Sequence, residues 1–292
     1  MSFDDMPNLG PFLRPGAQEY SDECIRLSRA AVPRTRNILD VPYGSDFFQK
    51  LDIFLPDRES SQPSPVLLFF HGGAWKNGFK EWMGFMAPPL VSLPAIFVSG
   101  NYRLAPTAKF PKPLDDCCDA LAWVWRNISA HGGDPGRIFV GGHSSGGHIA
   151  ALATLRPELL VARGLPRDCV KACFALSAAF NLERKSSGPL RAPVLDLVLE
   201  NGDDGSQATP LNFVRGNRIP FYIAYGTEDL PELIGENERM IELLRHENCA
   251  LEHHVFEKNS HFDTNIGCAN LNGPWVQTVR KWMASPPRAA KS

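Results

Sequence analysis

The sequence predicts an α/β fold with a mostly parallel β-sheet and helices on both of its faces. Short apolar runs that are typical of buried strands alternate with longer helical patterns along most of the 292 residues. This alternation favours parallel strands joined by helical crossovers. A second observation is that two of the apolar runs end in glycine-rich turns, one beginning at Gly72 and the other at Gly141.

The elements are expected in the following order. A helix over 18–31 precedes two antiparallel strands at 41–44 and 49–55, and a polar loop covers 58–65. Further strands are expected at 66–70, 95–99, 137–141, 170–177, 219–226 and 251–256, and helices at 80–93, 114–130, 149–155, 235–247 and 275–284. Residues 180–216 interrupt this alternation, because they are rich in Ser, Gly, Asp and Pro. We interpret them as a cap inserted into one domain that spans 1–292, with a surface loop as the alternative.

Composition excludes several classes of function. Hydrophobic residues make up 43% and charged residues 21%, which are ordinary values for a globular domain. The formal net charge of -2 gives no reason to expect a nucleic-acid partner or binding to an anionic membrane, and no apolar run approaches the length of a membrane span. The N-terminus lacks the basic and apolar regions of a signal peptide, so we expect a cytosolic protein.

The seven cysteines favour neither a metal site nor a disulfide framework. They are odd in number and irregularly spaced, and none forms a C-x-x-C pair. We therefore expect mostly reduced thiols, no structural metal and no cofactor. The expected partner is a small-molecule substrate. Two oligomeric states fit the sequence, a monomer and a homodimer.

The second glycine-rich turn has the pattern of a nucleophile elbow. Gly142-His143-Ser144-Ser145-Gly146 is a G-x-S-x-G motif between a strand-like apolar run and a helical run. Strand, sharp turn and helix are the context that this motif needs, because the turn holds the serine hydroxyl out over the sheet edge. The helix that follows turns its free N–H groups toward developing negative charge. Ser144 is therefore the predicted nucleophile.

The first glycine-rich turn supports this interpretation. The run His71-Gly-Gly-Ala-Trp75 follows the strand expected at 66–70. Two glycines at a strand end allow backbone N–H groups to approach a substrate with no Cβ in the way, as an oxyanion hole requires. An ordinary glycine turn is the alternative, and it explains both motifs together poorly.

A serine nucleophile needs a base that takes its proton and a carboxylate that orients the base. After a nucleophile elbow the acid comes next along the chain, just past a strand end, and the base comes last. Asp229 follows the strand expected at 219–226 and is the predicted acid, with Glu228 as its nearest rival. Asp203 and Asp204 lie in a glycine-rich stretch, where a turn or helix-cap role fits better.

The predicted base is His261, because it follows the last expected strand, 251–256. For the remaining candidates we expect structural or surface roles; they are His253 and His254 within that strand, and His71, His143 and His148 ahead of the acid.

These motifs resemble those of α/β hydrolases of the hormone-sensitive-lipase-like and kynurenine-formamidase-like group. The run His71–Trp75 is similar to the HGGXW motif of kynurenine formamidases. Segments similar to those of small esterases of the lipase branch are Asn101–Pro106, Phe110-Pro111, Asp115-Asp116 and Gly132–Ile138. The likeness covers about 40–285. It implies the α/β-hydrolase fold and a Ser-Asp-His triad, and it is weak as to substrate.

Two departures from the lipase branch lean toward formamidase-like or feruloyl-esterase-like proteins. Ala74 stands where that branch has a third glycine, and His143 stands where it has Asp. The HGGXW pattern implies that the N–H groups of Gly73 and Ala74 form the oxyanion hole together with Ser145. By the HGGG pattern, Gly72 would take part as well.

The shape of the substrate pocket is harder to predict. Trp75 directly after the oxyanion loop, together with the apolar segments of 180–216, favours a partly covered apolar pocket for the acyl or leaving group. The aromatic and methionine side chains at 79–86 fit the lining of that pocket and the buried face of a helix equally well.

The leading hypothesis is a serine carboxylesterase that cleaves small or aromatic esters through an acyl-enzyme. An arylformamidase that cleaves N-formylkynurenine-type amides is an alternative, and so is a transacylase or lyase of a natural-product pathway. A binding protein on an inactive hydrolase scaffold is disfavoured, because Ser144, Asp229, His261 and the oxyanion glycines are all present.

Overall fold

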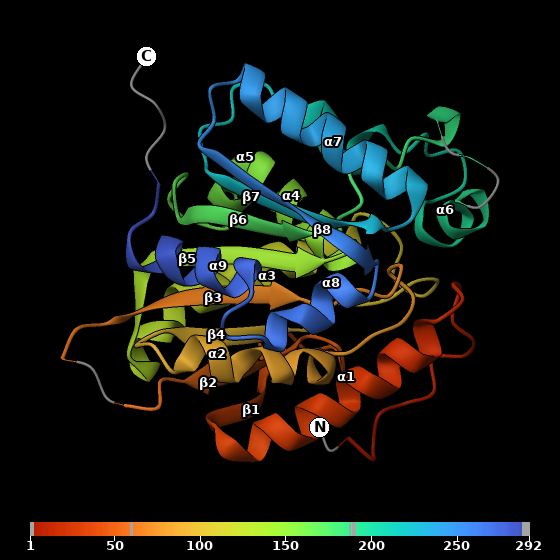
Figure 1. The fold of residues 1–292 in the computed structure, drawn as a ribbon. Coiled ribbons are helices and arrows are strands. Elements are labelled where there is room, and N and C mark those ends of the chain that lie inside the picture. The colour runs from red at the N-terminus through yellow and green to blue at the C-terminus, as the bar shows by residue number, and fades with distance from the viewer. Residues whose placement is uncertain (1–2, 59–60, 187, 189–190, 288–292) are drawn as a thin grey trace.

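The computed structural model describes residues 3–58, 61–186, 188 and 191–287. Within these residues eight strands form one sheet in the order β1-β2-β4-β3-β5-β6-β7-β8, shown in Figure 1. The strands are β1 Arg36–Pro42, β2 Lys50–Leu55, β3 Ser64–Phe70, β4 Ile96–Gly100, β5 Gly133–His143, β6 Val170–Leu176, β7 Phe221–Glu228 and β8 Leu251–Ser260. β2 runs antiparallel to β1 and to β4, and the other neighbours pair in parallel.

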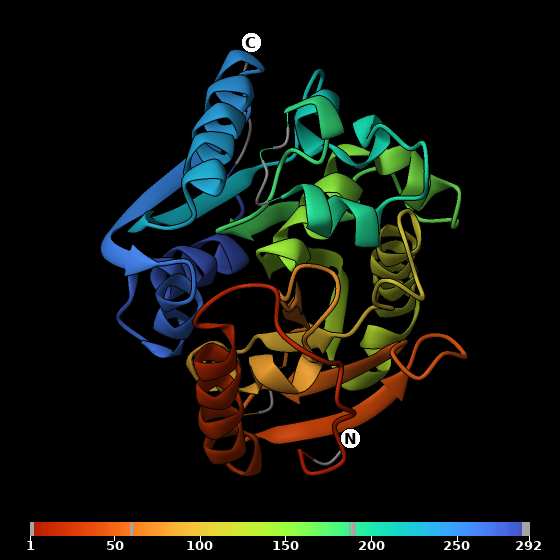
Figure 2. The ribbon, with the colours of Figure 1, turned by 90° about the vertical axis from the view of Figure 1, so that its right-hand side faces the viewer.

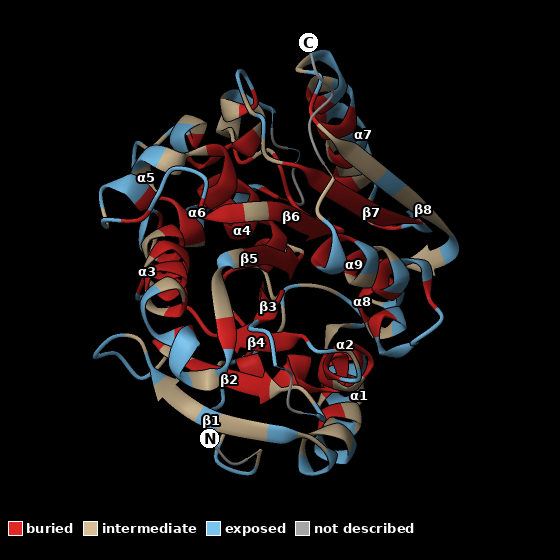
Figure 3. Ribbon diagram, turned by 90° about the vertical axis from the view of Figure 1, so that its left-hand side faces the viewer, coloured by how far each residue is buried: buried red, intermediate tan, exposed pale blue. Residues whose placement is uncertain are grey.

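Helices cover both faces of the sheet, as Figure 3 shows by the burial of their inner sides. The α-helices of the described residues are α1 Ala17–Ala31, α2 Ala87–Val91, α3 Lys112–Asn127, α4 Ser145–Leu155, α5 Pro157–Val161, α6 Ala192–Val198, α7 Pro231–His246, α8 Asp263–Ile266 and α9 Pro274–Ala284. Buried side chains of α3, α4 and α7 share one core, and those of α1, α2 and α9 share the other. The predicted mostly parallel sheet with helices on both faces is confirmed.

Strand β3 shows why the central strands are apolar throughout. Val66, Leu68 and Phe70 pack in the core on the α3–α4 side, whereas Leu67 and Phe69 pack in the core on the α1–α9 side. All five side chains have no solvent exposure. A strand of a parallel sheet with helices on both faces has no polar face, so its sequence does not alternate.

The carboxyl ends of the parallel strands meet at one edge of the sheet, which faces the viewer in Figure 2. At this edge β3 leads into His71, β5 into Ser144, β7 into Asp229 and β8 into His261. Chemistry in open α/β sheets gathers at the carboxyl ends of the strands, because loops from distant parts of the chain converge there. The fold therefore brings the four predicted functional segments together.

The segment ahead of α1 crosses the same edge, as Figure 2 shows. The Lys76 ammonium, in the loop after β3, donates hydrogen bonds to the carbonyl oxygens of Leu9 and Pro11, at 3.2 and 2.8 Å. The ring of Phe12 lies 6.1 Å from that of Trp82. These contacts hold the N-terminal segment over the site, which the sequence analysis did not predict.

Several elements differ from their predicted form; β8, for example, continues to Ser260 instead of ending at 256. The helix expected at 80–93 is a 3-10 helix over Lys80–Met86 that continues into the short α2. The first strand begins at Arg36 rather than at 41, and its pairing with β2 shifts between Ile38 and Val41 around Asp40, which has a φ of 60°. A bulge of this kind breaks the alternation of side chains, so a strand with one is hard to recognise in a sequence.

Other predictions concern cysteines and membrane spans. All seven cysteines lie within the described ranges as buried free thiols. No described helix combines the length and the apolar character needed to cross a membrane.

Candidate active site

Ser144 occupies the tight turn between β5 and α4, in a backbone conformation with a φ of 54° that non-glycine residues rarely adopt. Its N–H group donates a hydrogen bond to the carbonyl oxygen of Leu176 at 2.9 Å. The glycines on either side are needed for space. A Cβ on Gly142 would lie 2.2 Å from the carbonyl carbon of Gly146, and a Cβ on Gly146 would lie 2.2 Å from the carbonyl oxygen of Phe70. The close packing of the strand, turn and helix thus maintains the unusual backbone conformation of Ser144.

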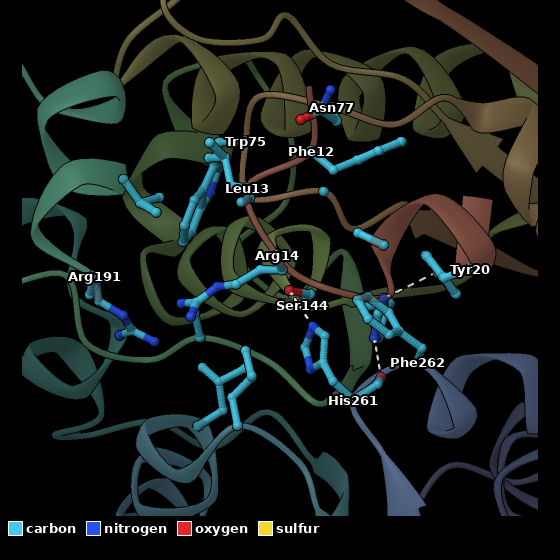
Figure 4. A pocket seen from close by; sticks show the side chains of 18 of the residues that line it. Phe12, Leu13, Arg14, Tyr20, Trp75, Asn77, Ser144, Arg191, His261 and Phe262 are labelled. Atoms are coloured by element: carbon cyan, nitrogen blue, oxygen red, sulfur yellow. Dashed lines mark hydrogen bonds between the residues drawn. The ribbon is translucent and has the colours of Figure 1, made fainter. Parts of the chain in front are cut away.

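The three predicted triad residues lie in hydrogen-bonding contact. His261 Nε2 is 3.0 Å from Ser144 Oγ, and His261 Nδ1 is 2.8 Å from Asp229 Oδ1. Figure 4 shows the His261 ring beside the Ser144 hydroxyl. If Nδ1 donates its proton to the carboxylate, Nε2 is free to accept one from the serine.

Asp229 is held as a carboxylate in a buried position. The Leu230 N–H group donates a hydrogen bond to Asp229 Oδ1 at 2.7 Å. Burial alone would raise the pKa of the Asp229 carboxyl, but the hydrogen bond and the charge of His261 outweigh it and hold that pKa below its usual range. An ionised acid behind the imidazole stabilises the positive charge that the ring acquires when it takes a proton.

The rival residues lie elsewhere. Glu228 is exposed, and the exposed His253 lies 3.5 Å from the Arg245 guanidinium. Asp203 and Asp204 accept hydrogen bonds from backbone N–H groups two residues further on, at 2.8 Å each, which is the expected turn role.

The glycine loop approaches Ser144 closely. A Cβ on Gly72 would lie 3.1 Å from the Ser144 Cβ. Gly73 has a φ of 125°, and a Cβ there would lie 2.0 Å from the carbonyl oxygen of Asn77. Ala74 also has a positive φ, 53°. Gly73 and Ala74 line the same pocket as Ser144, and the first N–H groups of α4, beginning with Ser145, have no partner within their helix.

Tyr102 connects the two halves of this predicted oxyanion hole. Its hydroxyl donates a hydrogen bond to the carbonyl oxygen of His71 at 3.1 Å and lies 3.1 Å from Ser145 Oγ, which can donate to it. The ring stacks on that of His71 with 4.6 Å between centroids. Burial raises the pKa of Tyr102, so its hydroxyl stays protonated. The sequence analysis assigned no role to this residue.

Trp75 is held in place by a histidine of α4. Its Nε1 donates a hydrogen bond to Nδ1 of His148 at 3.1 Å, and His148 Nε2 donates to the carbonyl oxygen of Ala208 at 2.6 Å. Burial lowers the pKa of His148 to about 4, which keeps the ring neutral and able to accept from Trp75. These two hydrogen bonds give His148 a structural role and connect the glycine loop, α4 and residues 180–216.

One pocket contains Ser144 and His261, and it is mostly apolar. Trp75 and Trp82 line it, whereas the other aromatic and methionine side chains at 79–86 are buried in the core. The N-terminal segment contributes a wall that was not predicted, made of Phe12, Leu13 and Arg14 (Figure 4). Residues 180–216, whose apolar segments were expected to help form the pocket, contribute Arg191 and Val194. Among the described residues, no three His, Cys, Asp or Glu side chains come together in a cluster that could hold a metal ion.

A family model named BD-FAE matches residues 51–234, which is more than half of the chain. The chain belongs to the BD-FAE family. The matched region includes the glycine loop, the elbow and Asp229, and it ends before His261. Together with the fold, this confirms the predicted likeness to α/β-hydrolase esterases.

Individual relatives of this BD-FAE chain carry esterase names. Esterase LipC of Mycobacterium tuberculosis (strain ATCC 25618 / H37Rv) is 29% identical over 245 residues, which cover 79% of this chain and 60% of LipC. Isoprenylcysteine alpha-carbonyl methylesterase ICME of Arabidopsis thaliana is 34% identical over 146 residues, which cover 49% of this chain and 34% of ICME. The chain thus spans less than two thirds of each relative's length.

Solved structures share the fold. The hyperthermophilic esterase of the archaeon Pyrobaculum calidifontis superposes with a TM-score of 0.71 at 22% identity, and the alignment covers 94% of this chain and 92% of that one. At this level of identity the likeness extends to the fold alone, so the chemistry must be argued from the residues of this chain.

Proposed function

We propose that this chain is a serine carboxylesterase that cleaves small or aromatic esters through an acyl-enzyme on Ser144. The observation that carries the proposal is the continuous line of hydrogen bonds from Ser144 Oγ to His261 and from His261 to Asp229, at 3.0 and 2.8 Å. The esterase names of the relatives support it.

In the proposed reaction His261 Nε2 takes the Ser144 proton while Oγ attacks the carbonyl carbon of the ester. The imidazolium that forms is stabilised by Asp229 and then protonates the leaving alcohol as the C–O bond breaks. Water, deprotonated by the same nitrogen, attacks the acyl carbon, and His261 then returns that proton to Ser144 Oγ as the acyl C–O bond breaks, which releases the carboxylic acid and restores the serine hydroxyl.

The oxyanion of each tetrahedral intermediate is proposed to bind N–H groups of Gly73, Ala74 and Ser145, with Gly72 close enough to take part. Positive φ values at Gly73 and Ala74 support this role, because such a turn directs successive N–H groups toward one side. Donors of this kind are each worth about 3 to 4 kcal/mol of transition-state stabilisation in a comparable hydrolase.

The pocket supports further parts of the proposal. Arg191 and Val194 line it, which favours a cap role for 180–216, and Trp75 is proposed to contact the acyl or leaving group. A cytosolic location and a homodimer stay predictions.

Arylformamidase activity is a second candidate, favoured by the HGG-Ala-Trp loop and by the position of Trp75 in the pocket wall. Both reactions use the same nucleophile and differ in the bond that breaks, an ester C–O or a formamide C–N.

A kinetic comparison tests the proposal. Purified protein is assayed with 4-nitrophenyl acetate and butyrate, a feruloyl ester and N-formylkynurenine, and a separate portion of the same protein is titrated with a fluorophosphonate, which counts the reactive Ser144 sites. The proposal predicts labelling and the highest kcat/KM on an ester. A higher kcat/KM on the formamide would favour the arylformamidase, transfer to an added alcohol would favour a transacylase, and a protein that is neither labelled nor active would contradict all three.

A further inference from the structure

The pocket around Ser144 contains two arginines. Among the lining residues that the structure describes, Arg14 and Arg191 carry the only permanent charges; most of the others are apolar or aromatic. The two come from different parts of the chain, the N-terminal segment and the insertion. In Figure 4 the Arg14 side chain extends across the pocket, and the Arg191 side chain extends toward the same region from its own wall.

Both guanidinium groups form ion pairs with glutamates of one helix, α7. Arg14 Nη2 lies 3.0 Å from Glu232 Oε1, and Arg191 Nη1 pairs with Glu236. Glu232 and Glu236 are one turn apart on α7, so they project from the same side of that helix. Neither glutamate lines the pocket. The arginines therefore face the pocket, and their carboxylate partners stand outside it.

The ion pair of Arg191 and Glu236 is largely buried and is supported by further hydrogen bonds. Glu236 also accepts hydrogen bonds from the backbone N–H groups of Phe180 and Asn181, at 2.7 and 3.1 Å. Arg191 Nη1 donates in addition to the Asn181 carbonyl oxygen. The Arg191 and Glu236 side chains are 9% and 11% exposed. This arrangement orients the guanidinium before any ligand binds, which lowers the entropic cost of binding.

Each guanidinium keeps donors for a ligand. An arginine has five N–H donors, and the described contacts of Arg14 and Arg191 engage one terminal nitrogen of each. Nε and the other terminal nitrogen of each side chain remain for a planar anion. Because each arginine is paired with a glutamate, the attraction comes from oriented donors and not from a net positive charge.

A purely structural role is the alternative, in which the two ion pairs tie the N-terminal segment and the insertion to α7. That role does not require the guanidinium groups to line the pocket of the nucleophile, and an ion pair that only joins two segments is found on the exposed surface, between Arg29 of α1 and Asp4.

We propose that the pocket selects esters that carry a carboxylate, or a similar planar anion, on the part of the substrate that contacts Arg14 and Arg191. This inference rests on the proposed esterase function and specifies its substrate class. A charge-assisted hydrogen bond to an oriented guanidinium predicts a preference of about 10- to 100-fold in kcat/KM for the anionic ester over a neutral isostere.

Two matched substrate pairs test the preference. On the leaving-group side 4-acetoxybenzoate is compared with 4-acetoxybenzamide. On the acyl side the monomethyl ester of terephthalic acid is compared with methyl 4-carbamoylbenzoate. Each kcat/KM is divided by the rate constant of hydroxide hydrolysis of the same ester, which removes the difference in intrinsic reactivity. The anionic member is expected to be preferred in at least one pair, and that pair identifies the side that meets the arginines.

Variants assign the preference to the two residues. In Arg14→Gln, and separately in the double variant Arg191→Met/Glu236→Gln, which leaves no unpaired buried carboxylate, the ratio of anionic to neutral kcat/KM is expected to fall by about 3- to 10-fold, so that the two losses together account for the preference. Arg26→Gln removes an exposed arginine with a glutamate partner and is expected to keep the wild-type ratio. Thermal melting of every variant checks the fold.

The outcomes separate this inference from the proposed function. Hydrolysis of the neutral esters with no preference for either anionic partner would overturn the inference and leave the esterase proposal intact. A preference that survives both arginine variants would also overturn it. Absence of hydrolysis of all four esters, with no fluorophosphonate labelling, would instead contradict the proposed function.

Discussion

His143 Nε2 donates a hydrogen bond to the backbone carbonyl oxygen of His261 at 2.9 Å. The same carbonyl oxygen accepts a second hydrogen bond from Thr264 Oγ1, also at 2.9 Å. Burial lowers the pKa of His143 to about 3, and the neighbouring His261 adds to this effect. The ring is therefore neutral, and it positions the proposed base instead of competing with it for the serine proton.

This relationship predicts that His143→Ala lowers kcat by a factor on the order of 10 to 100, with a smaller change in KM, because a small displacement of a catalytic group is costly. His143→Gln keeps a side-chain N–H donor and is expected to recover part of the loss. Steady-state kinetics on 4-nitrophenyl butyrate provide the measurement, and His254→Ala, outside the pocket, is the control. An equal kcat in His143→Ala and in the wild type would contradict the proposal that His143 positions His261.

A second prediction concerns the coupling of His261 and Asp229. Because the two act as one unit with Ser144, the losses of kcat in His261→Ala and Asp229→Asn are expected to be strongly non-additive. The double variant should be about as slow as His261→Ala alone. If His261→Ala stays active while His253→Ala or His254→Ala is inactive, the base has been assigned to the wrong histidine.

A third prediction concerns stability at acidic pH. Burial lowers the pKa values of His71, His143 and His148 from 6.5 to about 4, 3 and 4. Between about pH 6.5 and 4 the unfolded chain binds protons at these rings and the folded chain does not, so the free energy of unfolding falls as pH is lowered. Each ring contributes roughly 1.4 kcal/mol per pH unit in this window.

Urea denaturation at pH 7.5 and at pH 5.5 measures this loss, which should amount to a few kcal/mol. In His148→Gln, which preserves a donor for Ala208 and an acceptor for Trp75, the fall between the two pH values is expected to shrink by about one histidine's share. An unchanged fall in this variant would show that His148 is not buried as a neutral ring.

A fourth prediction concerns acyl length. The large apolar side chains that line the pocket are Phe12, Leu13, Trp75, Trp82 and Val194. We expect formyl to butyryl groups to be hydrolysed with a higher kcat/KM than acyl chains of ten or more carbons, because a long chain would have to displace the N-terminal segment. The measurement is a series of 4-nitrophenyl esters. Equal or higher kcat/KM on the long chains would indicate a lipase.

The triad geometry could be predicted because each of its members follows a strand with a clear apolar signature. Ser144 follows β5, Asp229 follows β7 and His261 follows β8, and parallel strands end at the same edge. The two glycines of the first turn added a chemical reason for the same location. At these positions the apolar strand patterns in the sequence and the topology of the parallel sheet point to the same site.

The walls and supports of the pocket could not be predicted in the same way. Leu13 and Arg14 belong to no periodic pattern, and their segment is held at the site by tertiary contacts, such as the hydrogen bonds of Lys76 to the carbonyl oxygens of Leu9 and Pro11. Tyr102 gains its role from contacts with His71 and Ser145, which are distant in sequence. Such roles depend on tertiary contacts that leave no mark on local composition.

The rate of ester hydrolysis by Ser144→Ala is the measurement that tests the central proposal most directly. The account predicts that kcat on 4-nitrophenyl butyrate falls by several orders of magnitude, roughly 10⁶ in a comparable serine hydrolase, while the melting temperature stays close to that of the wild type. The fluorophosphonate label should disappear in the same variant. Activity within tenfold of the wild type would contradict the assignment of Ser144 as the nucleophile.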